Sequence, residues 1–573
     1  MNIFNFYQKK IIETIKKNKR SLKISEVNFN GMQVELAPEK FNCDISTNIV
    51  MLLTKRYKKD LQTFAHDLKN LFIKKIKDFQ NIEIAGSGFL NITLKEKSLL
   101  KIIEQILKNK DKYGSLKQNK KINIEFVSAN PTGPMHVGHC RGAVLGDVIS
   151  NLFLFNGNKV IKEYYVNDYG VQINNFVKSV YLRIREIKYK ESFQNSPDLY
   201  PGDYIIDIAK NILKSHPKLN VDNYENCFNE LKNKSLKLSL DSIKKDLKSL
   251  GIVHNNFVSE TYLVNEDFVS KTINLLKKGS HIEEGFLQPP KGTENKNWKK
   301  IKRLIFKSTK FGDDNDRALQ KNDGSWTYFA NDVGYHNFKI SKKYDLLINI
   351  LGADHTGYIK RITAAVEAIS NGKTKLNCKV SQLVKLFKDG KPFKMSKRAG
   401  DFVTLNEFLN EVDKDAIRFM MLNRSSDVEL EFDFAKVIEK TKENPIFYVQ
   451  YANARINSIF RSLKKNKDKK IQLSDGTINF NEIEKKILRK SFEWPKIVEN
   501  SSNKLEPHRI TFYLYELSTL FHSFWSKGNE EEKYRIIIDG KLNRSESLLI
   551  LQLLSSVIRN GMQILGVSLP EKM

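Results

Sequence analysis

Cysteine is scarce in this sequence of 573 residues, and no two of its cysteines form a C-x-x-C pair. This spacing excludes the disulfide framework of a small secreted domain and the clustered thiolates of a structural zinc site. We therefore expect no zinc held by the protein and a reducing compartment, the cytoplasm. The four cysteines are Cys43, Cys140, Cys227 and Cys378.

Long uncharged apolar runs are also lacking. Near the N-terminus, Ile11, Ile12 and Ile15 are interrupted by lysines and by Glu13, which is unlike the apolar core of a signal peptide. No later run contains the roughly 18 apolar residues that a membrane span needs. We expect a soluble protein without a membrane partner.

Negative charge is in the minority, because 66 Asp and Glu face 96 Lys and Arg and leave a formal charge of +30. Such an excess favours a polyanionic partner, with nucleic acid the first choice. A bias of an AT-rich genome toward Lys, Asn and Ile would give the same composition. Charge alone does not separate the two explanations, so motifs must decide.

The length predicts three or so domains, because 573 residues exceed what one hydrophobic core usually supports. We expect a small α+β domain over residues 1–115. An α/β domain with a parallel sheet should cover 119–410, with a helical insertion at about 180–300. A linker and an all-helical domain should fill 411–573. The last domain should begin near Asn444-Pro445, where a helix N-cap is followed by proline at the first helical position.

A βαβ unit is the clearest local pattern. Apolar and polar residues alternate over 122–127, helical spacing of apolar residues follows the loop at 128–134, and a second strand is predicted at 160–166. The apolar run at 346–351 is typical of a buried parallel strand. The predicted sheet therefore has loops at the carboxyl ends of its strands, where α/β proteins bind ligands.

One such loop carries the strongest motif. His136 and His139 lie three residues apart at a predicted helix N-terminus, which suits phosphate, and Gly138 between them permits close approach of a ligand. The motif predicts an ATP cradle. Its residues are Ala129, Asn130, Pro131, Thr132, Gly133, Pro134, Met135, His136, Val137, Gly138 and His139.

A second motif lies about 250 residues downstream, in the basic segment Phe393-Lys-Met-Ser-Lys-Arg-Ala-Gly400. Lysines on a loop can neutralise charge that develops on a transferring phosphate and its leaving group. Taken alone, this segment is typical of a solvated charge run, and a bare H-x-G-H is typical of ordinary polar residues. Their order and distance from each other carry the functional argument.

Together the two motifs resemble the paired signatures of the class I aminoacyl-tRNA synthetases. The resemblance implies a Rossmann-like catalytic domain that forms an aminoacyl-adenylate from ATP with Mg²⁺ and then esterifies tRNA. It implies catalytic roles for His136, His139, Lys394 and Lys397. It also implies ATP contacts from Pro131, Gly133, His136, Gly138, His139, Asp354, His355 and Met395.

The segments around the first motif resemble the arginyl-tRNA synthetase family in particular. Glu125-Phe-Val-Ser-Ala-Asn130 matches the family's form of the preceding strand, and Tyr328 and Asp332 match its second pair of pocket residues. A guanidinium favours carboxylates in bidentate geometry. The sequence does not assign separate roles to Glu125 and Asp332. The implied arginine-binding residues are Glu125, Ser128, Asn130, His139, Gln172, Tyr328 and Asp332.

The resemblance extends to the ends of the chain. The segment at 83–90 is similar to the family domain that grips the tRNA elbow, and the C-terminal region is similar to the domain that reads the anticodon. Tyr448, Tyr451 and Arg455 fall on one predicted helical face, which suits either RNA stacking or core packing. The implied partners are tRNA(Arg), L-arginine and ATP, bound by a monomer.

Three other functions are weighed against an arginine-tRNA ligase. A cysteinyl enzyme would need zinc-ligand cysteines around its pocket, which this sequence lacks. A non-catalytic tRNA-binding paralogue would show decayed signatures, and both are whole here. A nucleotidyltransferase with H-x-G-H is usually far shorter and lacks a terminal helical domain.

Overall fold

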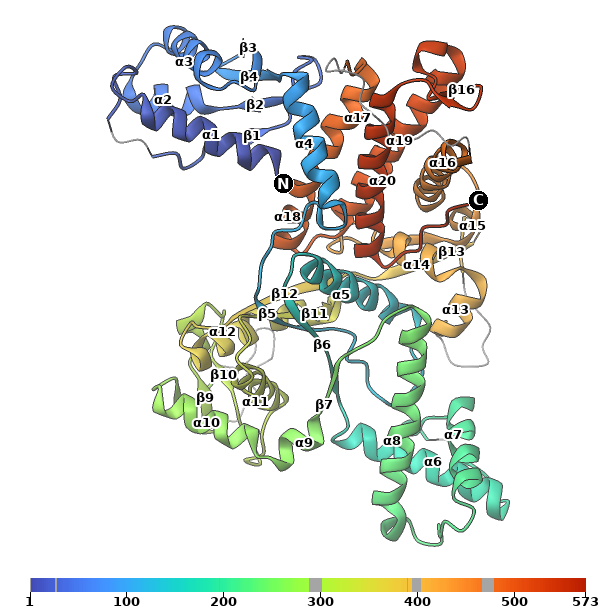
Figure 1. Ribbon diagram of the computed structural model, residues 1–573. Helices are drawn as coiled ribbons and strands as arrows, with labels where there is room; N and C mark the ends of the chain where they lie inside the picture. The colour runs from blue at the N-terminus through green and yellow to red at the C-terminus, as the bar shows by residue number, and fades with distance from the viewer. Residues whose placement is uncertain are drawn as a thin grey trace. The chain divides into compact units, whose positions relative to one another are not determined.

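The computed structural model describes residues 2–25, 28–194, 196–287, 301–388, 390–393, 403–465 and 479–573. They form two compact units, shown in Figure 1. The central unit consists of Lys117–Glu439 and Leu505–His508. The flanking unit consists of Met1–Leu116, Lys440–Lys504 and Arg509–Met573, so it joins the two ends of the chain.

The central unit is built on a five-stranded sheet of order β12-β11-β5-β6-β7, in which every neighbouring pair is parallel. Its strands are β5 (Lys121–Glu125), β6 (Lys159–Val166), β7 (Asn256–Ser259), β11 (Leu346–Gly352) and β12 (Lys375–Ser381). The chain runs from β5 to β6 on one side and returns to β11 on the other. The order in which the chain adds strands to the sheet therefore reverses between β5 and β11. The crevice at this point is where such folds bind ligands.

Helix α5 (Val137–Phe155) crosses one face of this sheet (Figure 1). Most of its residues are buried, as expected for a helix inside a core rather than on a surface. Gly146 lies where the helix meets Phe126, and a Cβ on it would stand 2.2 Å from the Phe126 ring. Glycine at this position lets the helix that carries the first motif pack directly on the strand before it.

The remaining elements of the central unit include the helical insertion and two small sheets. The helices are α6 (Val171–Tyr189), α7 (Asp203–Ser215), α8 (Tyr224–Ser249), α9 (Glu260–Asn265), α10 (Phe268–Lys278), η3 (Ser308–Phe311), α11 (Tyr328–Ser341), η4 (Ala353–Tyr358), α12 (Ile359–Ser370), α13 (Leu405–Glu411), α14 (Lys414–Met421) and α15 (Phe434–Ile438). The further strands are β8 (Ile282–Gly285), β9 (Arg303–Phe306), β10 (Arg317–Ala318), β13 (Val384–Lys388), β14 (Lys391–Pro392) and β15 (Leu430–Asp433).

The structure adds two details to the predicted boundaries. The segment predicted as a helical insertion, about 180–300, also contains β7, which is the edge strand of the main sheet and pairs with β6. The strand is only four residues long and follows a long charged helix, so its pattern is hidden in the sequence. The predicted boundary at 410 also differs, because the central unit continues to Glu439.

The N-terminal part of the flanking unit is an α+β domain, as predicted. Its sheet is four-stranded and antiparallel, of order β1-β2-β4-β3, and its outer hairpin turns at Gly86 and Gly88. The elements are α1 (Ile3–Lys17), β1 (Val34–Glu35), β2 (Ile45–Thr47), α2 (Ile49–Tyr57), α3 (Leu61–Lys75), β3 (Phe79–Ala85), β4 (Phe89–Leu94), α4 (Glu96–Lys108) and η1 (Lys110–Lys112).

The C-terminal part of the same unit is helical apart from one short hairpin. Its elements are α16 (Pro445–Lys465), α17 (Glu482–Phe492), α18 (Trp494–Lys504), α19 (His508–Glu530), η5 (Glu532–Tyr534), β16 (Ile537–Ile538), β17 (Lys541–Leu542) and α20 (Ser545–Leu565). Helix α20 is long and apolar enough to cross a membrane, but 83% of its apolar window is buried in the structure. It packs against α16, α17 and α4 as a core helix does.

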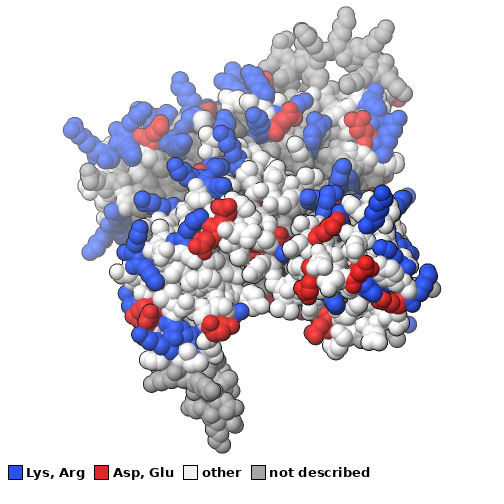
Figure 2. Space-filling view, turned by 90° about the horizontal axis from the view of Figure 1, so that it is seen from below, with Lys and Arg blue, Asp and Glu red and all other residues white. Residues whose placement is uncertain are grey.

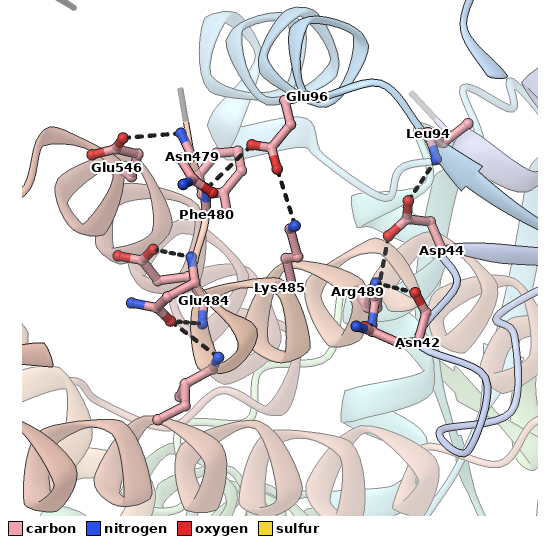
Figure 3. A network of polar contacts seen from close by, with 12 residues as sticks. Asn42, Asp44, Leu94, Glu96, Asn479, Phe480, Glu484, Lys485, Arg489 and Glu546 are labelled. Atoms are coloured by element: carbon pink, nitrogen blue, oxygen red, sulfur yellow. Dashed lines mark hydrogen bonds and ion pairs between the residues drawn. The ribbon is translucent and has the colours of Figure 1, made fainter. Parts of the chain in front are cut away.

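Polar side chains hold these two parts of the flanking unit together (Figure 3). Arg489 of α17 donates to the Asp44 carboxylate at 2.8 Å and to Asn42, and Asp44 also accepts from the Leu94 backbone N–H at 2.7 Å. Lys485 pairs with Glu96 at 3.0 Å. We call Asn42, Asp44, Glu96, Lys485 and Arg489 the closed network, because both of its carboxylates face a cation.

Candidate active site

The loops after β5 and β11 meet at the crevice of the central sheet. The register places Glu125, the last residue of β5, directly opposite Asn349 of β11. Backbone φ values of 71° at Val127 and 44° at Ser128 then turn the chain sharply. Positive φ is costly for a β-branched residue and is found mostly at functional sites. The turn brings the first motif over the crevice.

The motif histidines begin α5, as the sequence predicted. His136 is the N-cap residue and its Nδ1 accepts the Gly138 N–H at 3.1 Å, while His139 Nδ1 accepts the His136 N–H at 3.4 Å. The two rings lie 3.8 Å apart between centroids. Since each Nδ1 is an acceptor, the hydrogen of each neutral ring is on Nε2.

Both rings favour the neutral form. Burial lowers the pKa of His136, and burial together with the neighbouring His136 lowers the pKa of His139 to about 4. At neutral pH the pair therefore offers hydrogen-bond donors and the positive end of α5, without formal charge of its own. Such a site suits the phosphates of ATP.

The glycines and proline of the motif shape the same loop. A Cβ on Gly138 would stand 2.8 Å from the His136 ring, so a side chain here would displace the histidine. Pro131 is buried, and Gly133 lies beside the Tyr204 hydroxyl of α7. Tyr204 belongs to the insertion, which thus forms part of the rim of the crevice.

The structure describes the residues on either side of the second motif. Lys394, Met395 and Lys397 lie outside the described residues. The residues directly after the motif pair with the first motif, because the Val137 N–H donates to Val403 O at 3.0 Å and the Leu405 N–H donates to Met135 O at 2.8 Å. The chain therefore returns from the second motif beside the first, although about 250 residues separate them.

Asp354 and His355 lie on η4 at the carboxyl end of β11, on the β11 side of the crevice. Both are exposed, and they face each other with His355 Nε2 3.3 Å from the Asp354 carboxylate. Exposure leaves both side chains accessible to a ligand, and their contact with ATP stays a prediction.

Glu125 and Ser128, two of the predicted arginine-binding residues, contact each other. The Ser128 hydroxyl donates to Glu125 at 3.3 Å and accepts the Tyr165 N–H at 3.0 Å. The second Glu125 oxygen forms an ion pair with Lys339, whose side chain is fully buried. Sequence analysis did not identify Lys339, because a lysine on a helix is usually solvated.

Asn130 lies between two amides. It donates to Gln172 Oε1 at 3.0 Å, and Asn167 donates to Asn130 Oδ1 at 3.0 Å. The structure thus brings together two of the predicted arginine-binding residues from the β5 loop and from α6. Both are exposed toward solvent.

Tyr328 and Asp332 lie one turn apart on α11, as their spacing predicted. Asp332 is half-buried and contacts His336 Nδ1 at 3.1 Å. Burial would raise the pKa of Asp332, but His336, a hydrogen bond with Tyr358 and the charge of Lys339 outweigh it and lower the pKa. Tyr328 is 83% exposed and its ring lies under Lys321. The aspartate is therefore an anion within the site and the tyrosine lies at its opening.

Sequence analysis assigned no role to three further residues here, Tyr165, Asp168 and Glu260. Tyr165 is half-buried, and its burial and the charges of four carboxylates raise its pKa; in order of effect these are Glu260, Asp332, Glu125 and Asp168. The phenol ring thus stands among four acidic side chains. Asp168 is held by the Ser259 hydroxyl at 2.6 Å and the Thr261 N–H at 2.8 Å.

Glu260 is the most unusual of these acids. It is 7% exposed, accepts a hydrogen bond from Asn331 at 3.3 Å, and has a pKa raised to about 7 by burial and by the charges of Asp168 and Asp332. No Lys or Arg of the described chain is an ion-pair partner of Glu260. It directly follows β7, so identifying that strand in the sequence would have placed Glu260 at the carboxyl edge of the sheet.

The predicted tyrosine and arginine stripe on α16 belongs to the flanking unit. Tyr448 and Tyr451 both pack on His522 of α19, with ring centroids 4.2 and 5.6 Å away. Arg455 donates to the Tyr451 hydroxyl at 2.7 Å and lies over the Trp525 ring. All three stripe residues are half-buried. Core packing therefore explains the contacts of both tyrosine rings with His522, and part of each side chain stays exposed.

Three family models match the chain. They are described as "Arginyl tRNA synthetase N terminal domain" over residues 5–94, "tRNA synthetases class I (R), catalytic domain" over 102–461 and "DALR anticodon binding domain" over 449–573. The middle model covers more than half of the chain. It also spans the two signature motifs and every predicted pocket residue.

Curated relatives and a solved structure agree with these models. An arginine-tRNA ligase of Pelagibacter ubique (strain HTCC1062) is 53% identical over the whole of both chains, and one of Wolbachia pipientis wMel is 41% identical over the whole of both. Arginyl-tRNA synthetase of Thermus thermophilus has the same fold over the whole of both chains, with a TM-score of 0.71 at 18% identity.

Proposed function

Since the chain belongs to the arginyl-tRNA synthetase family and is an arginine-tRNA ligase, we propose a placement for its amino-acid substrate. The guanidinium of arginine binds between Asp332 and Glu260. The α-ammonium binds Glu125, and Asn130 accepts a hydrogen bond from the same group. Ser128 and Gln172 orient these two side chains, His139 lies next to the substrate carboxylate, and Tyr328 covers the opening.

The observation that carries this proposal is the excess of carboxylates around Tyr165, of which Glu260 is buried and Glu125, Asp168 and Asp332 are half-buried. Glu125, Asp168, Asp332 and Glu260 all raise the pKa of this phenol, and Lys339 pairs with only one of them. Buried carboxylates without counter-charge are costly, and a bound cation removes the cost. Arginine carries two cationic groups, so its side chain and its ammonium both meet an acid here.

The direction of the substrate follows from the chemistry. Activation joins the arginine carboxylate to the α-phosphate, and phosphate binding is assigned to His136 and His139 at the start of α5. Glu125 ends β5 and Asn130 lies in the loop before His136, whereas Glu260 begins α9 directly after β7 and Asp332 lies on α11. The amino-acid end of arginine therefore lies on the β5 loop and its guanidinium on the far wall.

ATP enters as its Mg²⁺ complex. The Nε2–H groups of His136 and His139 donate to the phosphates, Pro131, Gly133 and Gly138 line the cradle, and Asp354 and His355 contact the adenosine. A carboxylate oxygen of arginine attacks the α-phosphorus in line, the bond to the β-phosphate breaks, and pyrophosphate leaves. Lys394, Lys397 and the backbone at Met395 neutralise the charge that grows on the leaving group.

The second step transfers arginine to the terminal adenosine of tRNA(Arg). A ribose hydroxyl oxygen attacks the carbonyl carbon of the adenylate, its proton is lost to solvent or phosphate, and AMP leaves. No protein side chain is needed as a strong base, because the mixed anhydride is already activated.

Substrate analogues test the two ends of the pocket separately. With 5-guanidinopentanoic acid, which is arginine without its α-amino group, the inhibition constant should not change in Glu125→Gln but should rise in Glu260→Gln and Asp332→Asn. Glu125→Gln should instead raise the KM for arginine. Equal sensitivity of the analogue to all three substitutions would overturn the assignment.

Contacts with tRNA are assigned to the flanking unit. The whole sequence carries an excess of Lys and Arg, and on the face seen from below in Figure 2 these side chains lie mostly around the margin, with Asp and Glu among them. We propose that the N-terminal α+β domain holds the tRNA elbow and the half-buried α16 stripe faces the anticodon loop, in a cytoplasmic monomer. A salt titration of tRNA affinity tests the role of the charge: a steep slope supports binding, and a shallow slope supports compositional bias.

A further inference from the structure

A chain of hydrogen bonds connects two of the three proposed arginine-binding carboxylates, Glu125 and Asp332, through the protein interior. Lys339 Nζ pairs with Glu125 and donates to Asn349 Oδ1 at 3.1 Å. Asn349 Nδ2 lies 3.0 Å from His336 Nε2, and His336 Nδ1 lies 3.1 Å from the Asp332 carboxylate. We call Lys339, Asn349 and His336 the buried relay; all three are at most 4% exposed.

The direction of every hydrogen bond in the buried relay is set by Lys339. An ammonium group can only donate, so the amide oxygen of Asn349 must face it and the amide nitrogen must face His336. His336 Nε2 then accepts, which places the ring hydrogen on Nδ1, where it is shared by the Asp332 carboxylate at 3.1 Å and the Asp332 backbone carbonyl at 2.9 Å. One lysine thus delivers a donor to both carboxylates, directly to Glu125 and through two side chains to Asp332.

The surroundings keep Lys339 in this place. Its Nζ lies 4.4 Å from the centroid of the Tyr335 ring, and the Tyr335 hydroxyl donates to buried Glu163 at 2.8 Å. Asn349 sits on the strand beside Glu125, in register with it. Since Lys339 and Asp332 are on the same helix and Asn349 is on β11, the relay fixes α11 against the sheet at the level of the pocket.

We propose that Lys339 is a positioning residue for arginine recognition, acting through Glu125 directly and through Asn349 and His336 on Asp332. It holds the two carboxylates in the spacing that the ammonium and guanidinium groups of one arginine require. It also compensates the charge of Glu125 before arginine binds. This inference rests on the proposed placement of arginine.

Steady-state aminoacylation by the full chain tests the inference in a double-mutant cycle. Lys339→Met, Glu125→Gln and the double variant are compared for the KM of arginine and the KM of ATP. Lys339→Met should raise the KM of arginine about 10- to 100-fold, as for an unpaired buried partner, and change the KM of ATP less than about twofold. The double variant should raise the KM of arginine by less than the product of the two single effects, because Lys339 acts in part through that carboxylate, and any rise beyond Glu125→Gln alone reports the branch to Asp332.

Lys379→Met is the matched control. Lys379 is on β12 of the same sheet, its side chain is 12% exposed, and it pairs with Asp427 at 2.8 Å away from the pocket residues. Its loss should leave the KM of arginine unchanged. If Lys339→Met does not fold, the neutral double variant and Asn349→Leu take its place, and Asn349→Leu should raise the KM of arginine without changing that of ATP.

The possible results distinguish a failure of the Lys339 inference from a failure of the proposed arginine placement. A raised arginine KM in Glu125→Gln with no change in Lys339→Met overturns the role of Lys339 and leaves the arginine placement intact. No change in either variant overturns the arginine placement. Multiplicative effects in the double variant show that Lys339 does not act through Glu125, which also overturns the inference.

Discussion

The closed network of the flanking unit and the acidic pocket of the central unit both bury carboxylates, but they differ in charge balance. In the closed network, Asp44 faces Arg489 and Glu96 faces Lys485 (Figure 3). Four carboxylates surround Tyr165, and Lys339 forms an ion pair with one of them, Glu125. The charges of the closed network balance within the protein. The charges of the acidic pocket balance only when a cationic substrate is bound.

This distinction has opposite consequences for stability and activity. Breaking a complete buried pair leaves an uncompensated charge and destabilises the fold. Removing a carboxylate that has no counter-charge relieves a cost and leaves the fold intact, while the substrate loses its partner. The following experiments compare the two regions by the stability and by the activity of their variants.

Glu260→Gln should have the largest effect on activity. It removes the charge from the guanidinium end of the pocket but keeps an oxygen to accept from Asn331, so kcat/KM for arginine should fall about 100- to 1,000-fold. The thermal midpoint should stay equal or rise. A parallel fall in activity and midpoint would contradict the idea of a pocket with excess negative charge. Steady-state aminoacylation and a thermal scan give the two values.

Arg489→Ala should have the converse effect. Asp44 is 3% exposed and would lose its cation, so the flanking unit should be destabilised by about 3 kcal/mol. Denaturant unfolding, followed by a probe in the helical domain, measures this loss. The KM for arginine should not change below the unfolding transition. A stable variant would show that the closed network is not a determinant of the fold.

The pH dependence of arginine binding should show the pKa of about 7 of Glu260. Arginine needs the ionised carboxylate, so below this pKa its binding must first release a proton. The KM should therefore rise about tenfold between pH 8 and pH 6 and be constant above pH 8. In Glu260→Gln the profile should be flat over this range, whereas a retained slope would assign the titration to another group.

The smallest effect is expected from Lys496→Ala. Lys496 pairs with Glu35 at 2.9 Å in the same unit as Arg489, but both side chains are more than 40% exposed. Such pairs contribute about 0.5 kcal/mol or less. A loss as large as that of Arg489→Ala would show that burial is not what separates the two pairs.

Sequence analysis located the β5–α5 half of the site and missed much of the opposite wall. The segment from Glu125 to His139 was found because a strand, a glycine-bearing loop and a helix follow one another over a short stretch. Tyr328 and Asp332 were found through resemblance. Glu260 was missed because its strand is short and follows a helical segment with many charges.

The buried relay and the closed network were not predictable for a different reason. Lys339 and Arg489 have the sequence context of solvated helical residues, and their partners are far along the chain, 214 residues away for Glu125 and 445 for Asp44. Local periodicity reports which face of a helix is apolar. It does not report which strand or domain a charged side chain meets.

The separation of Asp44 and Arg489 also has a consequence for synthesis. The flanking unit is composed of the first and last parts of the chain, so its N-terminal domain leaves the ribosome long before its helical partner exists. At roughly 5–20 residues per second, the 445 residues between Asp44 and Arg489 take about 20–90 s to translate. During this time the carboxylate of Asp44 is hydrated rather than paired, and the nascent N-terminal domain must stay folded without the contacts that later bury it.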